Sequence, residues 1–405
     1  MKKILAIILA AVSALTVFSA CGEQPKDDGT EKQVQVKVNQ HTLYIRSDDN
    51  IEEMTANFIN SDSGKTEEVA MKKQKHEGKG CTFSCEGDVD TYNKVFINYD
   101  GLVTEEFAFN ECVSGWNLSG KRGLTPYTEG EKIDEQPKYD TVKLPGLGYY
   151  ENIYIWKPAD YNAKSKEKYA TIYMFDGLIN YVPVNGSLSD TCWNVTEHVK
   201  SMIKETGFKA IVVALDNGGN EKKEIARDDL LIPNLGKMAA QERSTKKLGQ
   251  QYANFITQKV VPYIRKNYNV YTDARHTAIA GSSLGGLEAF YVGMEHPDIF
   301  GTVGALSPSF WTYKEQTWRK YVEAKLENQK FAQNAPYIYL YSGGNNGDTG
   351  KETKMMAKVM RNLSYPKNKM AFDFFKNGSH IIPCWRDIYP EFLQAMVHQK
   401  ITPLQ

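Results

Sequence analysis

Residues 276–290 read HTAIAGSSLGGLEAF, an apolar run that passes through serines and glycines into a second apolar run. Within it, residues 281–285 form GSSLG and match the pattern G-x-S-x-G. In this pattern the serine, here Ser283, lies at a strained turn between a strand and a helix, and the small residues on either side let chain segments approach closely. Glycine and serine also occur in ordinary tight turns, so the surrounding sequence must decide between the two interpretations.

Segments typical of buried strands alternate with helical segments on both sides of this stretch. Apolar spacing predicts one helix over residues 249–268, kinked at Pro262, and a final helix over residues 385–400. The alternation predicts a mostly parallel sheet with helices on both faces. The strand-like segments are ENIYIWKP, YATIYMF, KAIVVAL, HTAIAG, TVGAL, YIYLYSG and MAFDFF, which begin at residues 151, 169, 209, 276, 302, 337 and 370.

Two polar residues follow the last two of these strands. Asp348 comes after YIYLYSG, and His380 comes after MAFDFF, just before the final helix. Because the carboxyl ends of parallel strands meet at one edge of a sheet, we expect Ser283, Asp348 and His380 to converge there. A serine hydroxyl needs a base within hydrogen-bond distance, and the base needs an anion to orient it. Glu352 follows the same strand as Asp348 and is the alternative acid.

The chain from about Tyr150 to Lys400 resembles the esterase D-like family of α/β-hydrolases, which includes feruloyl and acetyl xylan esterases, enterochelin esterases and mycolyltransferases. The resemblance implies an α/β-hydrolase fold, no cofactor, Ser283 as the nucleophile and His380 as the base. The segments that carry it are IYIWKPADYN, YMFDG, FITQKVVPYIRKNY, GSSLGG, GMEHPDIFGTVGALSPSFW and GSH.

A tetrahedral intermediate on Ser283 needs hydrogen-bond donors aimed at its oxyanion. We expect one donor to be the backbone N–H of Leu284, the residue after the nucleophile. The second is expected in the loop after YATIYMF, from the backbone of Gly177 or Leu178.

Three residues are expected on the substrate side of the pocket. Phe310 and Trp311 follow the strand TVGAL and are expected in the pocket wall, with core packing as the alternative. Arg227 lies in the loop 217–231, where similar enzymes place residues that face the substrate.

Residues 1–21 have two lysines and a short apolar run, and residues 18–22 read FSACG, which resembles a bacterial lipobox. We expect a lipoprotein signal peptide with Cys21 as the lipidated residue, and a plain secreted protein with a free Cys21 is the alternative. The polar residues 22–33 predict a tether. The expected location is the bacterial cell surface, with a lipid anchor in the outer side of the cytoplasmic membrane, or the secreted fraction.

Residues 34–118 alternate in short runs separated by turn residues, which predicts a small all-β sandwich. The segment faintly resembles carbohydrate-binding modules. Its aromatic residues are expected either to form a sugar-stacking platform or to fill the core. A linker is predicted over residues 119–138, and the α/β-hydrolase domain over residues 139–405. The candidate platform residues are Tyr92, Phe96, Tyr99 and Trp116.

Charge and cysteine usage exclude some classes of function. The 49 basic residues balance the 49 acidic ones, so no global field favours nucleic acid, and no nucleic-acid partner is expected. Cysteine and histidine lack the spacing typical of zinc sites, so no metal is expected. Beyond Cys21 the chain has five cysteines, an odd number, and a disulfide between Cys192 and Cys384 is left open.

Together these features predict a serine esterase that removes acetyl or feruloyl groups from complex carbohydrate. Two alternatives use the same chemistry: a siderophore esterase, and an acyltransferase in which a sugar hydroxyl replaces water. A third alternative is a carbohydrate-binding lipoprotein whose hydrolase domain has lost activity.

Overall fold

A computed structural model describes residues 40–75, 80–113, 115–119, 123–127, 137–147, 150–182, 192–216, 225–239, 246–345 and 347–401. All of these described residues belong to one compact unit, Asn39–Gln405. The predicted signal peptide, the tether and Cys21 therefore lie outside the described residues.

The N-terminal part of the described chain is a sandwich of two β-sheets. The first has the strand order β10-β9-β1-β5-β4, formed by Gly123–Tyr127, Gly115–Ser119, Gln40–Ser47, Cys81–Asp88 and Lys72–Gln74. The second has the order β3-β2-β6-β7, with β8 also beside β6, formed by Thr66–Ala70, Met54–Ile59, Lys94–Tyr99, Leu102–Val103 and Phe107–Ala108. Alternate residues of β2 and β6 are buried, and both sheets contribute to one core, as the sequence predicts. We call residues 40–127 the β-module.

One boundary of the β-module is corrected, and burial decides between the two alternatives for three of its aromatic residues. Strand β10 pairs with β9, so the β-module reaches Tyr127 rather than ending at residue 118, and part of the predicted linker is a strand. Tyr92, Tyr99 and Trp116 are only 2%, 7% and 6% exposed and belong to the core. These three rings cannot form a sugar-stacking platform.

The second part of the chain is built on an eight-stranded sheet with the order β11-β12-β14-β13-β15-β16-β17-β18. Strands β11 and β12 pair antiparallel at one edge, and all pairs from β14 to β18 are parallel. Every residue of β13, β14, β15 and β16 is buried, as expected for parallel strands covered on both faces. The eight strands in sheet order are Tyr139–Pro145, Tyr150–Trp156, Ala210–Leu215, Ala170–Met174, Thr277–Ser282, Thr302–Leu306, Tyr337–Gly343 and Met370–Phe375.

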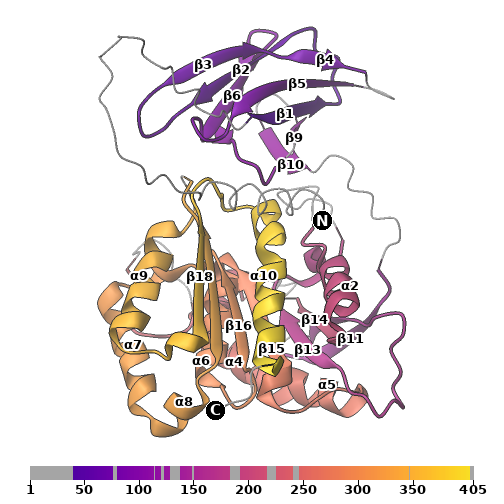
Figure 1. The fold of residues 1–405 in the computed structure, drawn as a ribbon, viewed down its shortest axis with the longest axis vertical. Helices are drawn as coiled ribbons and strands as arrows, with labels where there is room; N and C mark the ends of the chain where they lie inside the picture. The colour runs from indigo at the N-terminus through magenta and orange to yellow at the C-terminus, as the bar shows by residue number, and fades with distance from the viewer. Residues whose placement is uncertain are drawn as a thin grey trace, which may run out of the picture. The chain divides into compact units, whose positions relative to one another are not determined.

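Helices cover both faces of this sheet (Figure 1). Tyr173 of β13 faces one core and its neighbour Ile172 faces the other, because successive strand residues point to opposite faces. The first core is covered by α3 (Arg227–Leu230), α4 (Gly249–Phe255), α5 (Val261–Asn267), α6 (Ser283–Glu295), α7 (Glu315–Glu327), α8 (Gln329–Asn334) and α9 (Gly350–Asn362). The opposite core is covered by α2 (Val195–Thr206) and α10 (Ile382–Ile401), which contact each other. This arrangement confirms the predicted α/β-hydrolase architecture.

The helix predicted over residues 249–268 changes its winding just before Pro262, where the sequence predicts a kink. A π-helical segment, Ile256–Val260, separates α4 from α5, and Pro262 lies in the first turn of α5. The backbone stays helical throughout, and Pro262 accounts for the local change because a proline has no N–H to donate to the preceding turn.

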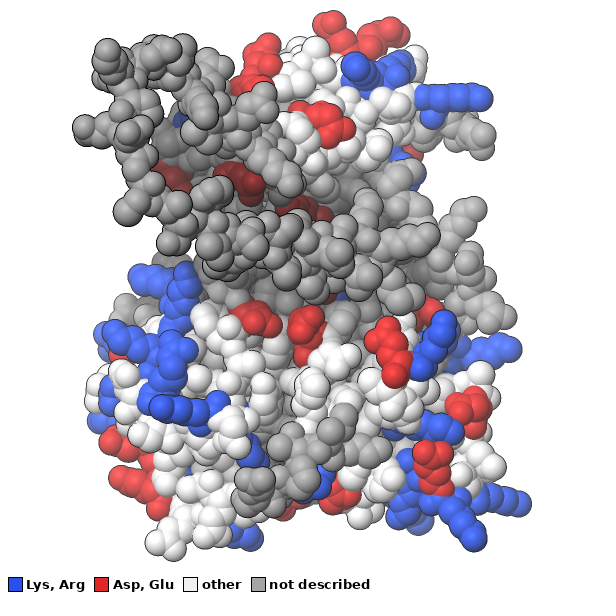
Figure 2. All heavy atoms as spheres, viewed as in Figure 1, with Lys and Arg blue, Asp and Glu red and all other residues white. Residues whose placement is uncertain are grey.

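Basic and acidic side chains are interspersed over the face drawn in Figure 2. With a formal net charge of zero, the chain presents no dominant field of one sign. Within the described ranges, no helix combines the length and the apolar character needed to cross a bilayer.

Candidate active site

Ser283 lies at the junction of β15 and α6 with a φ of 54°, in the left-handed region that a non-glycine residue rarely adopts. Close packing around the turn requires the glycines. A Cβ on Gly281 would lie 2.8 Å from the backbone of Gly285, and a Cβ on Gly285 would lie 2.9 Å from Cβ of Phe175. The structure therefore has the strained strand-to-helix turn that the G-x-S-x-G pattern predicts.

The structure brings His380 and Asp348 together. Nδ1 of His380 lies 3.0 Å from Oδ1 of Asp348, whose side chain is fully buried. With Nδ1–H donating to the carboxylate, Nε2 is left free to accept a proton. Asp348, rather than Glu352, contacts the histidine.

A network of donors surrounds the buried carboxylate of Asp348. The backbone N–H of Gly343 and the hydroxyl of Ser307 donate to Oδ2 at 2.6 and 2.9 Å, and the backbone N–H of Thr349 donates to Oδ1 at 2.7 Å. Nε1–H of Trp385 donates in turn to Oγ of Ser307 at 3.0 Å. These bonds compensate for the loss of water around a buried charge. Sequence reasoning missed Ser307, although its position directly after β16 places it at the same sheet edge.

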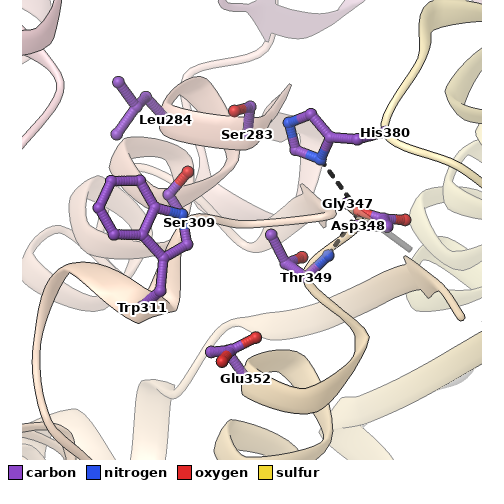
Figure 3. A pocket seen from close by; sticks show the side chains of 9 residues that line it. All are labelled: Ser283, Leu284, Ser309, Trp311, Gly347, Asp348, Thr349, Glu352 and His380. Atoms are coloured by element: carbon purple, nitrogen blue, oxygen red, sulfur yellow. Dashed lines mark hydrogen bonds and ion pairs between the residues drawn. The ribbon is translucent and has the colours of Figure 1, made fainter. Parts of the chain in front are cut away.

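Figure 3 shows the imidazole of His380 between Ser283 and Asp348. In the described conformation the Ser283 hydroxyl is turned away from the ring, and within the described part of the chain no hydrogen bond joins these two side chains. Rotation of the Ser283 side chain about its Cα–Cβ bond to another staggered position changes the direction of Oγ relative to the imidazole. Hydrogen bonds between catalytic groups are often long or misaligned without substrate, so this geometry is compatible with proton transfer.

A cavity of about 390 Å³ opens beside Ser283. The indole of Trp311 is 36% exposed and forms one wall, and Glu352 faces the cavity from the first turn of α9 (Figure 3). No lysine or arginine is present among the described residues that line it. The lining residues are Ser283, Leu284, Ser309, Trp311, Gly347, Asp348, Thr349, Glu352 and His380.

The two aromatic residues expected in the pocket wall have different positions. Trp311 lines the cavity, but Phe310 is fully buried and packs edge-to-face against Phe290 and Trp318. The expected pocket role of Phe310 is therefore corrected to core packing. Arg227 begins α3, and its side chain lies outside the described part of the structure.

The loop expected to supply oxyanion donors lies against the serine turn. Oγ of Ser282 donates to Asp176 at 3.3 Å, and the side chain of Asn180 donates to the carbonyl oxygens of Phe175 and Gly177 at 2.7 and 2.8 Å. Leu284 lines the cavity, whereas Gly177 and Leu178 are not among its described lining residues. The roles of all three as donors stay predictions.

The five described cysteines, Cys81, Cys85, Cys112, Cys192 and Cys384, are free thiols. Cys384 contacts Cys112 rather than Cys192, whose sulfur lies 3.6 Å from the carbonyl oxygen of Tyr181. Among the described residues, no group of three or more His, Cys, Asp or Glu side chains is placed to hold a metal ion.

A family model described as "Putative esterase" matches residues 147–397, more than half of the chain. The chain belongs to this esterase family. The match confirms the resemblance to the esterase D-like family that the sequence motifs indicate.

Solved structures of esterases share the fold of this family member. The enterobactin esterase FES from Shigella flexneri is 14% identical, with a TM-score of 0.53, and the match covers 89% of this chain and 92% of that one. A ferulic acid esterase is 20% identical, with a TM-score of 0.50, over 65% of this chain and 100% of that one. A feruloyl esterase module from Clostridium thermocellum, in complex with sinapinate, is 15% identical, with a TM-score of 0.50, over 67% and 91%.

A curated relative, the uncharacterized protein YbbA of Bacillus subtilis, is 34% identical over 64 residues. The match spans 16% of this chain and 26% of that relative, so it covers a quarter of the relative's length.

Proposed function

We propose that this esterase family member is a serine carboxylic ester hydrolase in which Ser283, His380 and Asp348 act together. The observation that supports this best is the hydrogen bond between His380 and the buried carboxylate of Asp348, beside a serine in a strained strand-to-helix turn. All three residues line one cavity, where a substrate can reach Ser283 and His380.

In the proposed mechanism, Oγ of Ser283 attacks the ester carbonyl while Nε2 of His380 takes its proton. Asp348 holds the imidazole in the correct tautomer and stabilises its charge. Backbone N–H groups of Leu284 and of Gly177 or Leu178 bind the oxyanion. His380 then gives its proton to the leaving alcohol, and water hydrolyses the acyl-enzyme in a second, equivalent cycle.

The proposed substrates are acetyl or feruloyl esters of complex carbohydrate. The exposed indole of Trp311 provides an apolar face, and the carboxylate of Glu352 accepts hydrogen bonds from hydroxyl groups. The cavity volume of about 390 Å³ lies in the range of small-molecule sites. Two fold relatives are described as feruloyl or ferulic acid esterases, which agrees with this class.

A siderophore esterase is the second candidate. The likeness to the enterobactin esterase covers 89% of this chain, against 65% for the ferulic acid esterase. That structure was determined in the presence of a dihydroxybenzoyl-serine, a compound with a free carboxylate. Glu352 would repel this group, and none of the described cavity residues is a lysine or arginine that could bind it. The charge of the cavity therefore disfavours siderophore fragments that carry a free carboxylate, whereas a neutral carbohydrate ester meets no such repulsion.

We further propose that Cys21 carries a lipid that anchors the protein to the outer side of the cytoplasmic membrane. The support is the sequence FSACG after a short apolar run. Growth with a labelled fatty acid is expected to label the unmodified protein and not Cys21→Ser. Equal labelling of Cys21→Ser would refute the anchor.

Hydrolysis of p-nitrophenyl acetate tests the enzymatic proposal. We expect turnover by the unmodified protein and none by Ser283→Ala. Acetylated xylo-oligosaccharides, feruloylated arabino-oligosaccharides and an ester of dihydroxybenzoyl-serine then separate the substrate classes. An acylated sugar formed in place of free acid would identify an acyltransferase. Binding of the oligosaccharides without turnover of any ester would identify an inactive binding protein.

A further inference from the structure

The loops that carry the proposed acid and base are bonded to each other. The backbone N–H of Gly344 donates to the carbonyl oxygen of Phe375 at 2.9 Å, and that of Asn345 donates to Gly378 at 3.0 Å. A Cβ on Gly343 would lie 2.1 Å from the carbonyl oxygen of Gly378, so the two loops touch along their backbones. A shift of one loop therefore moves the other.

The β-module contacts both loops through asparagine side chains. Nδ2 of Asn345, in the loop of Asp348, donates to the carbonyl oxygen of Asn93 at 2.9 Å. Nδ2 of Asn377, in the loop of His380, donates to the carbonyl oxygen of Val89 at 2.8 Å. The backbone positions that receive these bonds are fixed, because they lie just after β5 and just before β6.

Asn110 of the β-module makes the contact nearest to the histidine. Its side chain is 1% exposed, and its Nδ2 donates at 3.1 Å to Oγ of Ser379, the residue before His380. Its Oδ1 accepts the backbone N–H of Cys112 at 2.9 Å, which fixes the amide within the β-module. A buried amide that is bonded on both sides holds its partner in one place, since each broken bond leaves a buried polar group unsatisfied.

Apolar contacts surround these hydrogen bonds. Cys384, in the first turn of α10, is 1% exposed and belongs to the core of the β-module, with Phe375 and Ile381 packed against it. The thiol of Cys112 is hydrogen-bonded to Cys384, and this bond together with burial raises the pKa of Cys112 well above its usual value. The contact is therefore packed like a protein interior, and the thiol of Cys112 stays protonated at neutral pH.

We propose that Asn110 and Asn345 are positioning residues, through which the β-module fixes the loops of His380 and Asp348 in catalytic register. The β-module then acts as a structural part of the active site rather than as a separate binding domain. This inference rests on the proposed function of Ser283, His380 and Asp348.

The test compares Asn110→Ala and Asn345→Ala with a control inside the same β-module. Cys81→Ala is the control, because Cys81 is buried and its thiol donates to the carbonyl oxygen of Asp49. It lies at the opposite end of β5 from Asp88, about 24 Å away by strand rise. Two rates are measured well below each Tm: labelling of Ser283 by a fluorophosphonate, and turnover of p-nitrophenyl acetate.

We expect each asparagine variant to lower kcat and the labelling rate by about 10-fold or more, because a displacement of one ångström can cost about 100-fold. KM is expected to stay within about twofold, since the substrate contacts remain. Cys81→Ala is expected to lower Tm and to react at the rate of the unmodified protein. This split separates positioning from general stability.

Folded asparagine variants that react at the unmodified rate would overturn the inference, as would an equal loss in Cys81→Ala. If Asn110→Ala does not fold, Asn345→Ala decides, because its bond to Asn93 can be removed without emptying the core. If the unmodified protein takes the label and both asparagine variants take it at the same rate, only the positioning role is refuted. An unmodified protein that neither takes the label nor turns over ester removes the proposed function and this inference with it.

Discussion

His380 and Asp348 meet at 3.0 Å although they follow different strands, β18 and β17. The carboxylate is fully buried, and each of its oxygens accepts two hydrogen bonds. Such a carboxylate can fix the imidazole only while it remains an acceptor on the side of His380. This contact supports Asp348 as the triad acid in the mechanism we propose.

Replacement of Asp348 by asparagine tests this assignment. The amide places N–H groups where the carboxylate accepts, which favours the wrong tautomer of His380. We expect kcat for p-nitrophenyl acetate to fall by about 10³- to 10⁴-fold, with little change in the circular dichroism spectrum. A variant within tenfold of the unmodified protein would move the role to another acid, with Glu352 the next to examine.

Ser307 is expected to support Asp348. Its hydroxyl donates to the carboxylate and accepts Nε1–H of Trp385, so Ser307→Ala leaves the buried indole N–H unsatisfied. We expect a loss of about 1 to 3 kcal/mol in the free energy of unfolding, together with a lower kcat. Urea denaturation and steady-state kinetics measure the two effects. Unchanged values for both would show that water replaces the hydroxyl.

Much of the site could be predicted because it depends on local patterns and on a simple topological rule. The run 276–290 specifies a strand, a tight turn and a helix, and parallel strands bring their carboxyl ends to one edge. Ser283, Asp348 and His380 follow three such strands, so their convergence is a consequence of the strand order. The pattern did not reveal Ser307, whose role depends on contacts with two distant side chains.

Other features had no usable signal in the sequence. Phe310 and Trp311 are neighbours in one 3₁₀ turn, Phe310–Thr312, and residues in such a turn point in different directions. Nothing local shows which of them faces the cavity. The glycine and proline of the segment GLTPY favour a linker. In the structure this segment pairs with β9 at a sheet edge, where proline is tolerated. The bond from Asn110 to Ser379 joins positions 269 residues apart.

Gly281→Ala is expected to destabilise the protein. The added methyl group would lie 2.8 Å from the backbone of Gly285, which cannot move without displacing α6. We expect a loss of about 1 to 3 kcal/mol, the usual cost of overpacking, measured as a lower urea midpoint. Gly64→Asn is the control, since Gly64 has a φ of 72° and no neighbouring atom within 4 Å of an added Cβ, and asparagine tolerates that conformation. Equal effects of the two variants would contradict the steric explanation.

Glu288, in α6, gives a prediction about pH. It is fully buried, and neither carboxyl oxygen has a hydrogen-bond partner among the described residues. Burial, together with the charge of Glu295, raises the pKa of Glu288 well above its usual value. The native state therefore keeps a proton that the unfolded chain loses near its ordinary pKa of about 4.3. Stability contributed by this group is complete below that pH and decreases as pH rises toward the native pKa.

Glu288→Gln removes this titration. Relative to the unmodified protein, we expect the free energy of unfolding of this variant to increase between pH 5 and pH 8. The increase is about 1.4 kcal/mol for each pH unit over which Glu288 is protonated in the native state and ionised in the unfolded chain. Urea denaturation at the two pH values measures the difference. Glu323→Gln, at an exposed position of α7, is the control and should follow the unmodified protein. Parallel pH curves for all three proteins would mean that Glu288 titrates normally.

Charge reversal at Glu352 distinguishes the two substrate classes. Glu352 and Trp311 both line the cavity (Figure 3), and among its described lining residues there is neither a lysine nor an arginine. If the substrate is a neutral carbohydrate ester, Glu352→Lys loses hydrogen-bond acceptors, and KM for an acetylated or feruloylated oligosaccharide should rise about tenfold, equivalent to about 1.4 kcal/mol. The same variant should lower KM for an anionic ester of dihydroxybenzoyl-serine, because repulsion becomes attraction.

Glu323→Lys is the control, because it changes the net charge equally on exposed α7, away from the described cavity lining. It should leave both KM values unchanged. Similar behaviour of the two lysine variants would show that Glu352 does not contact the substrate, and a preference of the unmodified protein for the anionic ester would favour the siderophore class.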